Sequence, residues 1–186
     1  MPNKPVVIIL AAGKGERFLA SGGKTHKLAA PLLGVTVLEH VIRTVEASGL
    51  EAHIVKSASG DGMADSIAAG VNATAQASGW LILPGDLPLI QAESLRRVAS
   101  ELSRYKVVVP QYRQQQGHPV GFSKKCFDAL AILSGDGGAK AVIQKCRSSG
   151  EVLDLSLDDL GVITDIDTVD DLREAEKLCS QMANPA

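Results

Sequence analysis

The chain has 186 residues with 19 basic and 21 acidic side chains, and its formal net charge at pH 7 is −2. This length suits one domain with a sizeable buried core, so we predict a single domain over residues 1–186. The near balance of charge argues against nucleic acid or a membrane surface as the main partner. A few cations can still hold a small anionic ligand.

The sequence shows no signal for secretion or membrane insertion. No apolar segment reaches the roughly 18 residues that span a bilayer. The N-terminal apolar run is short and lacks a cationic lead-in with a cleavage site, so we expect a cytoplasmic protein. The three cysteines, Cys126, Cys146 and Cys179, are widely spaced and form no metal or redox motif, which favours reduced thiols.

Apolar runs of strand length alternate with stretches of helical periodicity, which is the pattern of a parallel α/β sheet. Five large apolar residues in a row predict a strand over Val6–Leu10 that is buried on both faces. Apolar residues at steps of three and four from Val37 to Val45 predict a helix, and Gly49 is suited to end it. Further strands are expected near 52–55, 80–83, 107–109, 119–122, 152–155 and 162–166, further helices near 64–75, 92–102, 124–133, 139–146 and 169–178, and a polar turn over 111–117.

The loop that follows the first strand combines small residues with positive charge. Small side chains leave room for a ligand to touch the backbone, and Lys14 and Arg17 supply the charge that a triphosphate requires. The loop lacks the Gly-Lys-Ser/Thr ending of a Walker loop and the third glycine of a dinucleotide fingerprint. An ordinary turn between strand and helix therefore stays open as the alternative. The small residues of this loop are Ala11, Ala12, Gly13 and Gly15.

A second glycine-bearing loop, residues 84–88, follows the strand expected at 80–83. Its two prolines stiffen the turn that holds Asp86. A carboxylate in this place suits Mg²⁺, which commonly takes one or two carboxylates together with substrate phosphates. The alternative is an aspartate that caps the helix beginning near Gln91. Ligands of open α/β sheets bind beyond the carboxyl ends of the strands, so we expect this loop and the first one to meet around one ligand.

Four acidic residues cluster near the start of the last predicted helix. Capping by Thr168 or Asp167, with acids in the first helical turn, explains several of them without any ligand. One remaining acid is a candidate second metal ligand. Strand alternation places Asp165 and Asp167 on the same side and does not choose between them. The other two acids are Asp170 and Asp171.

Three further segments offer candidate ligand contacts, each with a plain structural alternative. Segment 60–66 opens a helix whose amides can take an anion or a ribose hydroxyl, although Asp61 or Asp65 can simply cap that helix. His118 lies in a turn, where histidines are more often structural or exposed than catalytic. The loop 135–138 is a flexible helix entry that can contact a substrate or be a plain loop.

Taken together and in this order, these segments resemble the molybdenum cofactor nucleotidyltransferases, in particular their molybdopterin cytidylyltransferase-like members. The resemblance spans roughly residues 5–178. It implies an α/β, mostly parallel Rossmann-like sheet in the glycosyltransferase-A-like nucleotidyltransferase fold. The motifs that carry it are Leu10-Ala11-Ala12-Gly13-x-Gly-x-Arg17, Lys27 before Pro31, residues 60–66, Gly85-Asp86-Leu87-Pro88, Gly117-His118-Pro119-Val120-x-Phe122, Gly135-Asp136-x-Gly138-Ala139 and Asp165-Ile166-Asp167-Thr168.

The resemblance also implies a Mg²⁺-dependent enzyme that transfers a nucleotidyl group from an NTP to a phosphorylated acceptor, molybdopterin, and releases pyrophosphate. A molybdoenzyme or its maturation factor is an expected partner on the same ground. By motif, Arg17, Lys27 and Asp86 are implied to be catalytic. Ala11, Ala12, Gly13, Gly60, Asp61 and Ser66 are implied to bind the nucleotide, Asp86 and Asp167 the metal with Asp165 in reserve, and His118 and Gly137 the acceptor.

The Ala11-Ala12-Gly13 form is similar to that of cytidylyl members, whereas guanylyl relatives usually have two glycines there, so CTP is the expected donor. Guanylyl transfer and transfer to a sugar phosphate stay open, as does a nucleotide-binding maturation chaperone or regulator without activity. The chain departs from the family pattern in two places. Segment 49–59 is shorter, which predicts a sheet one strand short, and segment 19–26 is longer, so Lys24 competes with Lys27 for the phosphates.

Overall fold

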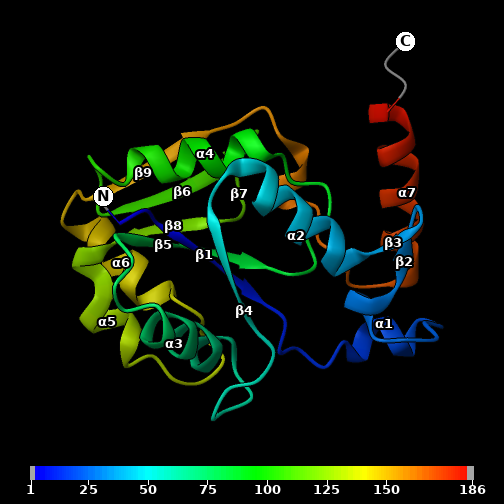
Figure 1. Ribbon diagram of the computed structural model, residues 1–186, viewed down its shortest axis with the longest axis horizontal. Helices are drawn as coiled ribbons and strands as arrows, with labels where there is room; N and C mark the ends of the chain where they lie inside the picture. Colours follow the sequence, from blue (N-terminus) through cyan, green and yellow to red (C-terminus); the bar gives the residue numbers. More distant parts are fainter. Residues whose placement is uncertain (1–2, 184–186) are drawn as a thin grey trace.

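The computed structural model describes residues 3–183. Within this part, a central sheet of seven strands is built from β1 (Val6–Leu10), β4 (Glu51–Val55), β5 (Gly79–Pro84), β6 (Val107–Tyr112), β7 (Gln115–Gln116), β8 (Val120–Ser123) and β9 (Val152–Ser156) (Figure 1). The strand order is β4-β1-β5-β8-β6-β7, and β9 pairs with the other side of β6. β1 is parallel to β4 and β5, and β6 is parallel to β9, whereas β8 and β7 run antiparallel to their neighbours. The prediction of an α/β fold with a mostly parallel sheet is confirmed.

Helices cover both faces of the sheet. One face carries α2 (Val37–Ser48) and α4 (Ala92–Glu101), and the other carries α3 (Met63–Ala73), α5 (Phe127–Ala131) and α6 (Lys140–Ser148) (Figure 1). Side chains of β1 alternate between the two cores, so that Ile8 packs on the α3 side and Ile9 on the α2 side. Because both faces of β1 are buried, its sequence is a continuous apolar run.

A third apolar cluster lies beside the carboxyl end of β1. It joins α1 (Glu16–Ala20), the hairpin of β2 (Pro31–Leu32) and β3 (Val35–Thr36), and α7 (Val169–Ala183), which lie together at one end of the sheet (Figure 1). Phe18, Leu32 and Ile166 are nearly completely buried within it. The cluster therefore anchors the loop after β1, and the turn that carries Lys27, against the last helix.

The prediction of a strand over 162–166 is wrong. The chain forms a 3₁₀ helix over Leu160–Ile163 and an irregular stretch after it. Asp159 accepts a hydrogen bond from the Gly161 amide at 2.8 Å, and a Cβ at Gly161 would overlap the Leu89 carbonyl, so the backbone is tightly turned here. The Val162 carbonyl accepts from the His118 amide at 2.8 Å, which joins this stretch to a loop rather than to a neighbouring strand.

Two smaller expectations also needed correction. The helix expected over 124–133 is a 3₁₀ turn, Lys124–Cys126, followed by α5. The polar turn expected over 111–117 contains the end of β6 and the short strand β7, which pairs with it. The last helix extends five residues beyond the expected 178, to Ala183, and the short elements α1, β2 and β3 were not predicted. The remaining elements match within two or three residues. β4 is an edge strand beside β1, and no other strand of the described chain pairs with it.

Among the described residues, no helix is both long and apolar enough to cross a membrane. Cys126, Cys146 and Cys179 are all free thiols, as predicted. Burial raises the pKa of the Cys126 thiol to about 12, so this thiol stays protonated and packs as a small apolar side chain.

Candidate functional site

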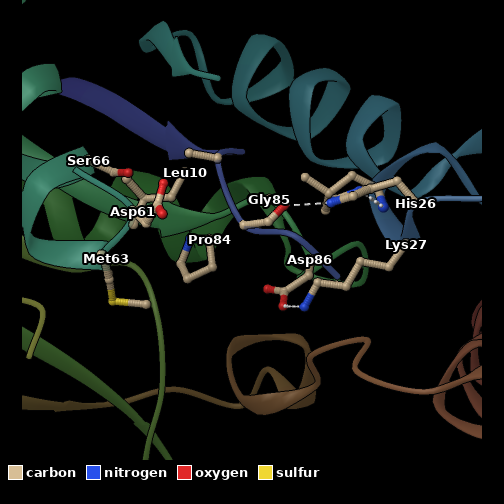
Figure 2. A pocket seen from close by; sticks show the side chains of 13 residues that line it. Leu10, His26, Lys27, Asp61, Met63, Ser66, Pro84, Gly85 and Asp86 are labelled. Carbon is tan, nitrogen blue, oxygen red and sulfur yellow. Dashed lines mark hydrogen bonds and ion pairs between the residues drawn. The ribbon is translucent and has the colours of Figure 1, made fainter. Parts of the chain in front are cut away.

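The first pocket lies beyond the carboxyl ends of β1 and β5, between the loops that follow these strands (Figure 2). It encloses about 190 Å³. The Gly85 amide donates to the Leu10 carbonyl at 2.9 Å, which ties the two loops together. Lys14 and Asp61, both largely exposed, form an ion pair of 3.6 Å between the first loop and the segment before α3. The two glycine-bearing loops meet at one pocket, and their meeting around one ligand stays a prediction.

Four charged side chains of alternating sign lie beside this pocket. Lys27 Nζ donates to Asp86 Oδ2 at 2.8 Å, and these two side chains are 16 % and 15 % exposed (Figure 2). The same ammonium lies 3.8 Å from Asp167 Oδ1, and Arg17 Nη1 donates to Asp167 Oδ2 at 2.7 Å. Limited access of water to the Lys27–Asp86 pair strengthens its attraction relative to that of an exposed pair. Lys27 and Asp86 line the pocket, and Asp167 and Arg17 continue the chain of ion pairs away from it.

The structure separates the acids that cap α7 from those that face the cations. Asp171 Oδ2 accepts from the amides of Asp167 and Thr168, at 3.0 and 2.8 Å. Thr168 Oγ1 accepts in turn from the Asp171 amide at 3.2 Å. Thr168 and Asp171 therefore form the capping pair. The Asp167 carboxylate takes no part in the cap and contacts Arg17 and Lys27 instead.

Asp86 does not cap the helix that begins near Gln91. The carboxylate that contacts the start of this helix is Asp159, whose Oδ2 accepts from the Gln91 amide at 2.9 Å and from the Ser94 hydroxyl at 2.6 Å. Asp165 lies close enough to Asp86 for the two carboxylates to interact electrostatically. Partial desolvation, and then the Asp86 carboxylate, raise the pKa of Asp165 above its ordinary value.

Asp86 and Asp167 are the side chains here that suit a divalent cation. Both carboxylates already converge on one positive charge, the Lys27 ammonium. Carboxylate oxygens are hard ligands of the kind that Mg²⁺ and Mn²⁺ accept. Within residues 3–183, no group of three or more His, Cys, Asp or Glu side chains is arranged to hold a metal ion. A cation at this place would therefore also need oxygen ligands from a substrate.

His26 is a site residue that the sequence reasoning missed. Its Nδ1 accepts from the Leu28 amide at 3.2 Å, so the ring proton is on Nε2, which donates to the Gly13 carbonyl at 2.6 Å. The ring thus joins the first loop to the turn that carries Lys27. A Cβ at Gly15, which has φ 65°, would lie 3.2 Å from the same ring. No local pattern marks a histidine for this role, since its partners lie in two different loops.

A second pocket of about 380 Å³ lies next to the first, and Met63 lines both. His118 and Gly137, the predicted acceptor residues, line this second pocket. His118 Nδ1 is buried and has no hydrogen-bond partner among the described residues. Burial lowers the pKa of His118, although the Asp86 carboxylate and the Ile82 carbonyl oppose the shift. The neutral form of the ring is therefore favoured, and its unpaired Nδ1 lies buried in the wall of the second pocket.

Most of the predicted site residues lie at these two pockets. Four do not line either one: Ala11, Gly60, Arg17 and Asp167. The Ala11 amide donates to the Val55 carbonyl at 2.9 Å, which fixes the start of the first loop. Lys24 is exposed and forms no ion pair with a described residue. The residues that line the first pocket as expected are Ala12, Gly13, Lys27, Asp61, Ser66 and Asp86.

The sequence matches the MobA-like NTP transferase domain over residues 7–58 and 49–152. The chain belongs to this family. The predicted resemblance is confirmed, and the chain carries an NTP transferase domain. Residues 49–58 belong to both matched segments.

Curated relatives of this MobA-like NTP transferase are long, two-function proteins. The bifunctional protein GlmU of Xanthomonas euvesicatoria pv. vesicatoria is 27 % identical over 180 residues, which cover 85 % of this chain and 37 % of that protein. GlmU of Streptococcus agalactiae serotype V is 30 % identical over 139 residues, covering 63 % of this chain and 29 % of that protein. The chain thus spans about a third of the length of these curated relatives.

Solved structures of similar fold include Rv0371c from Mycobacterium tuberculosis, with a TM-score of 0.74 and 25 % identity over 94 % of this chain and 98 % of that chain. A second structure of that protein, in complex with manganese, has a TM-score of 0.70 and 23 % identity, and the match covers 95 % of this chain and 100 % of that chain. Molybdopterin-guanine dinucleotide biosynthesis protein A from Archaeoglobus fulgidus has a TM-score of 0.63 and 18 % identity, and the match covers 95 % of this chain and 100 % of that chain. CMP:2-keto-3-deoxy-manno-octonic acid synthetase complexed with CTP has a TM-score of 0.64 and 12 % identity, and the match covers 96 % of this chain and 99 % of that chain.

Replacement of His26 by alanine is expected to weaken NTP binding about tenfold, because the first loop and the Lys27 turn lose their common partner. Two lost hydrogen bonds should also lower the free energy of unfolding by about 1–2 kcal/mol. Calorimetric titration with an NTP and thermal unfolding measure the two effects. His53→Ala, on the edge strand β4, is the matched control. An unchanged NTP affinity in His26→Ala would contradict the role assigned to His26.

Proposed function

We propose that this nucleotidyltransferase transfers a CMP group from CTP to a phosphorylated acceptor, molybdopterin, in a Mg²⁺-dependent reaction that releases pyrophosphate. The observation that carries the proposal is the pairing of two adjacent pockets. The first contains the mostly buried Lys27–Asp86 pair, and the second shares Met63 with it. A donor nucleotide in the first pocket and an acceptor in the second would meet beside the charged residues.

The proposed reaction needs no general base, because the attacking oxygen is already deprotonated. An oxygen of the acceptor phosphate, already an anion, forms a bond to the α-phosphorus, and the bond from that phosphorus to the bridging oxygen breaks. Pyrophosphate leaves with the electron pair. Catalysis then consists of aligning two anions and offsetting the charge that builds up on the leaving group. In this proposal, Lys27 and Arg17 offset that charge, and the amides of Ala12 and Gly13 approach the nucleotide.

Asp86 and Asp167 are the proposed ligands of the cation. A bound Mg²⁺ would supply positive charge to the phosphate oxygens, as it commonly does with one or two carboxylates and substrate phosphates. The convergence of both carboxylates on the Lys27 ammonium supports this assignment, because the site already accommodates a positive charge there. The manganese complex of Rv0371c is further support for a divalent cation in this fold.

For the base, the Ala11-Ala12-Gly13 form of the first loop supports CTP over GTP. Gly60, Asp61 and Ser66 are the proposed contacts of the base and ribose. Asp61 and Ser66 line the first pocket, and Ser66 is almost fully buried at the start of α3. The complex of CMP:2-keto-3-deoxy-manno-octonic acid synthetase with CTP is a precedent for cytidine nucleotides in this fold.

For the acceptor, the lining of the second pocket favours a planar heterocycle over a sugar. Its lining includes Ile82, Val109 and Phe122, and polar side chains such as His118 and Lys140 also line it. Each hydroxyl of a sugar buried against apolar side chains would need a partner, at a cost of about 1–3 kcal/mol for each one left unpaired. A pterin can place its flat faces on the apolar side chains and its polar edge on His118.

The proposal is tested by pyrophosphate release from the purified chain with Mg²⁺, molybdopterin and each NTP in turn. We expect CTP to support the fastest release, at least about tenfold above GTP, since one or two specific base contacts are worth that much. Faster release with GTP would show that the base is misassigned. A hexose 1-phosphate replaces molybdopterin in a parallel arm, and faster release there would favour a sugar-phosphate acceptor. Failure of every NTP to bind at millimolar concentration would leave a maturation chaperone or regulator as the better interpretation.

A further inference from the structure

The loop 135–138 is docked on the segment before α3 by backbone contacts. The Ala64 amide donates to the Gly135 carbonyl at 3.0 Å. A Cβ at Gly62 would overlap that same carbonyl, so glycine is needed for this close approach. Segment 60–66 borders the first pocket, and the loop 135–138 borders the second. The contact therefore joins the walls of the two pockets.

Asp65 lies at the centre of this contact. Its Oδ2 accepts from the Gly62 amide at 3.1 Å and from the Gly135 amide at 3.3 Å. Gly60 leaves space for the carboxylate, because a Cβ there would overlap it. One oxygen atom thus accepts hydrogen bonds from both segment 60–66, beside the first pocket, and the loop 135–138, beside the second.

Leu133 and Ala139 pack on the core at either end of the loop 135–138, and the Lys140 amide donates to the Gly137 carbonyl at 3.5 Å, but the tip between them makes few other contacts. Gly135, Asp136 and Gly137 are exposed, and Gly135 adopts the left-handed conformation with φ 89°. Gly138 approaches the Met63 side chain closely, but Met63 is itself 45 % exposed. The hydrogen bonds to Asp65 and Ala64 are therefore the main restraint on where the loop lies.

We propose that Asp65 is a positioning residue, which fastens the loop 135–138 to segment 60–66 and so keeps the two pockets in a fixed relation. The inference rests on the proposed function, because it takes the second pocket to bind the acceptor. A misplacement of about 1 Å between reacting groups can lower a rate about 10²-fold. Loss of the restraint should therefore impair use of the acceptor more than binding of the nucleotide, which also has proposed contacts with the first loop and Lys27.

The test compares Asp65→Ala with Asp65→Asn in the full chain. Alanine removes the accepting oxygen, whereas the side-chain oxygen of asparagine can accept from both amides in place of Oδ2. Hydrogen–deuterium exchange of the free protein is followed over residues 133–139, and steady-state kinetics give the KM of the acceptor and of the NTP separately. Asp128→Asn, an exposed acid on α5, is the control for loss of charge alone.

Asp65→Ala is expected to exchange faster over residues 133–139 and to raise the acceptor KM about tenfold, with the NTP KM within about twofold of wild type. Asp65→Asn and Asp128→Asn should resemble wild type. Unchanged exchange over 133–139 in Asp65→Ala would overturn the proposal. Faster exchange confined to the first turn of α3 would also overturn it, because a helix cap alone gives that result.

An Asp65→Asn variant that behaves like Asp65→Ala would likewise overturn the proposal, since charge rather than hydrogen bonding would then hold the loop. Failure of the proposed function is a different outcome. In that case no variant, wild type included, releases pyrophosphate, and the exchange over residues 133–139 still decides the role of Asp65.

Discussion

Replacement of Asp86 by asparagine is expected to lower the rate of pyrophosphate release at least about 10²–10³-fold while the protein stays folded. Asparagine has nearly the same shape but no charge, so it is a poor ligand for Mg²⁺ and a weak partner for Lys27. The Lys27–Asp86 pair is mostly buried, with a separation of 2.8 Å. Its loss should therefore lower the free energy of unfolding by about 1–3 kcal/mol.

Pyrophosphate release and thermal unfolding, measured on the same preparation, check the Asp86→Asn prediction. Asp128→Asn removes an exposed carboxylate from α5 and should leave both the rate and the unfolding temperature close to wild type. An Asp86→Asn enzyme that turns over at the wild-type rate would remove Asp86 from the chemistry and from the proposed cation site.

Replacement of Lys27 by alanine is expected to lower the same rate about 10²–10³-fold, whereas Lys24→Ala should stay within about threefold of wild type. Lys27 is 16 % exposed and contacts both Asp86 and Asp167. Lys24 is exposed on the long loop before it. Only Lys27 therefore has a fixed charge beside the first pocket.

Lys27→Met separates charge from packing in this experiment, because methionine keeps an unbranched apolar stem. Its rate should fall as far as that of Lys27→Ala, with a smaller change in unfolding temperature. A larger loss of rate in Lys24→Ala than in Lys27→Ala would assign the phosphates to Lys24 and contradict the proposed site.

Much of the fold could be predicted from local pattern. The continuous apolar run of β1 identified a strand buried on both faces, and the periodicity from Val37 to Val45 identified α2, which ends at Gly49 in the left-handed conformation. The segment 162–166 has the same apolar character, yet it forms a 3₁₀ helix and an irregular stretch. Its conformation is decided by contacts of Gly161 and Val162 with distant backbone, which a local pattern does not contain.

The candidate site was predicted in its parts but not in its connections. Ala12, Gly13 and Asp86 lie where the two loops open at one edge of the sheet, as the rule for parallel strands indicates. The structure brings Asp167, rather than Asp165, into contact with Lys27, since Thr168 and Asp171 provide the helix cap. The roles of these residues in binding and catalysis, the single-domain organisation and the cytoplasmic location stay predictions.

By itself, the sequence determined that this chain is an α/β protein with two glycine-bearing loops at the ends of buried strands, because residue periodicity and backbone preference are local properties. Only the tertiary structure decided which charges meet. Lys27 reaches Asp86 across 59 residues and Arg17 reaches Asp167 across 150, and His26 and Asp65 each join two separate loops. Such pairs depend on the order of strands in the sheet and on the third apolar cluster, which together fix how distant segments lie against one another.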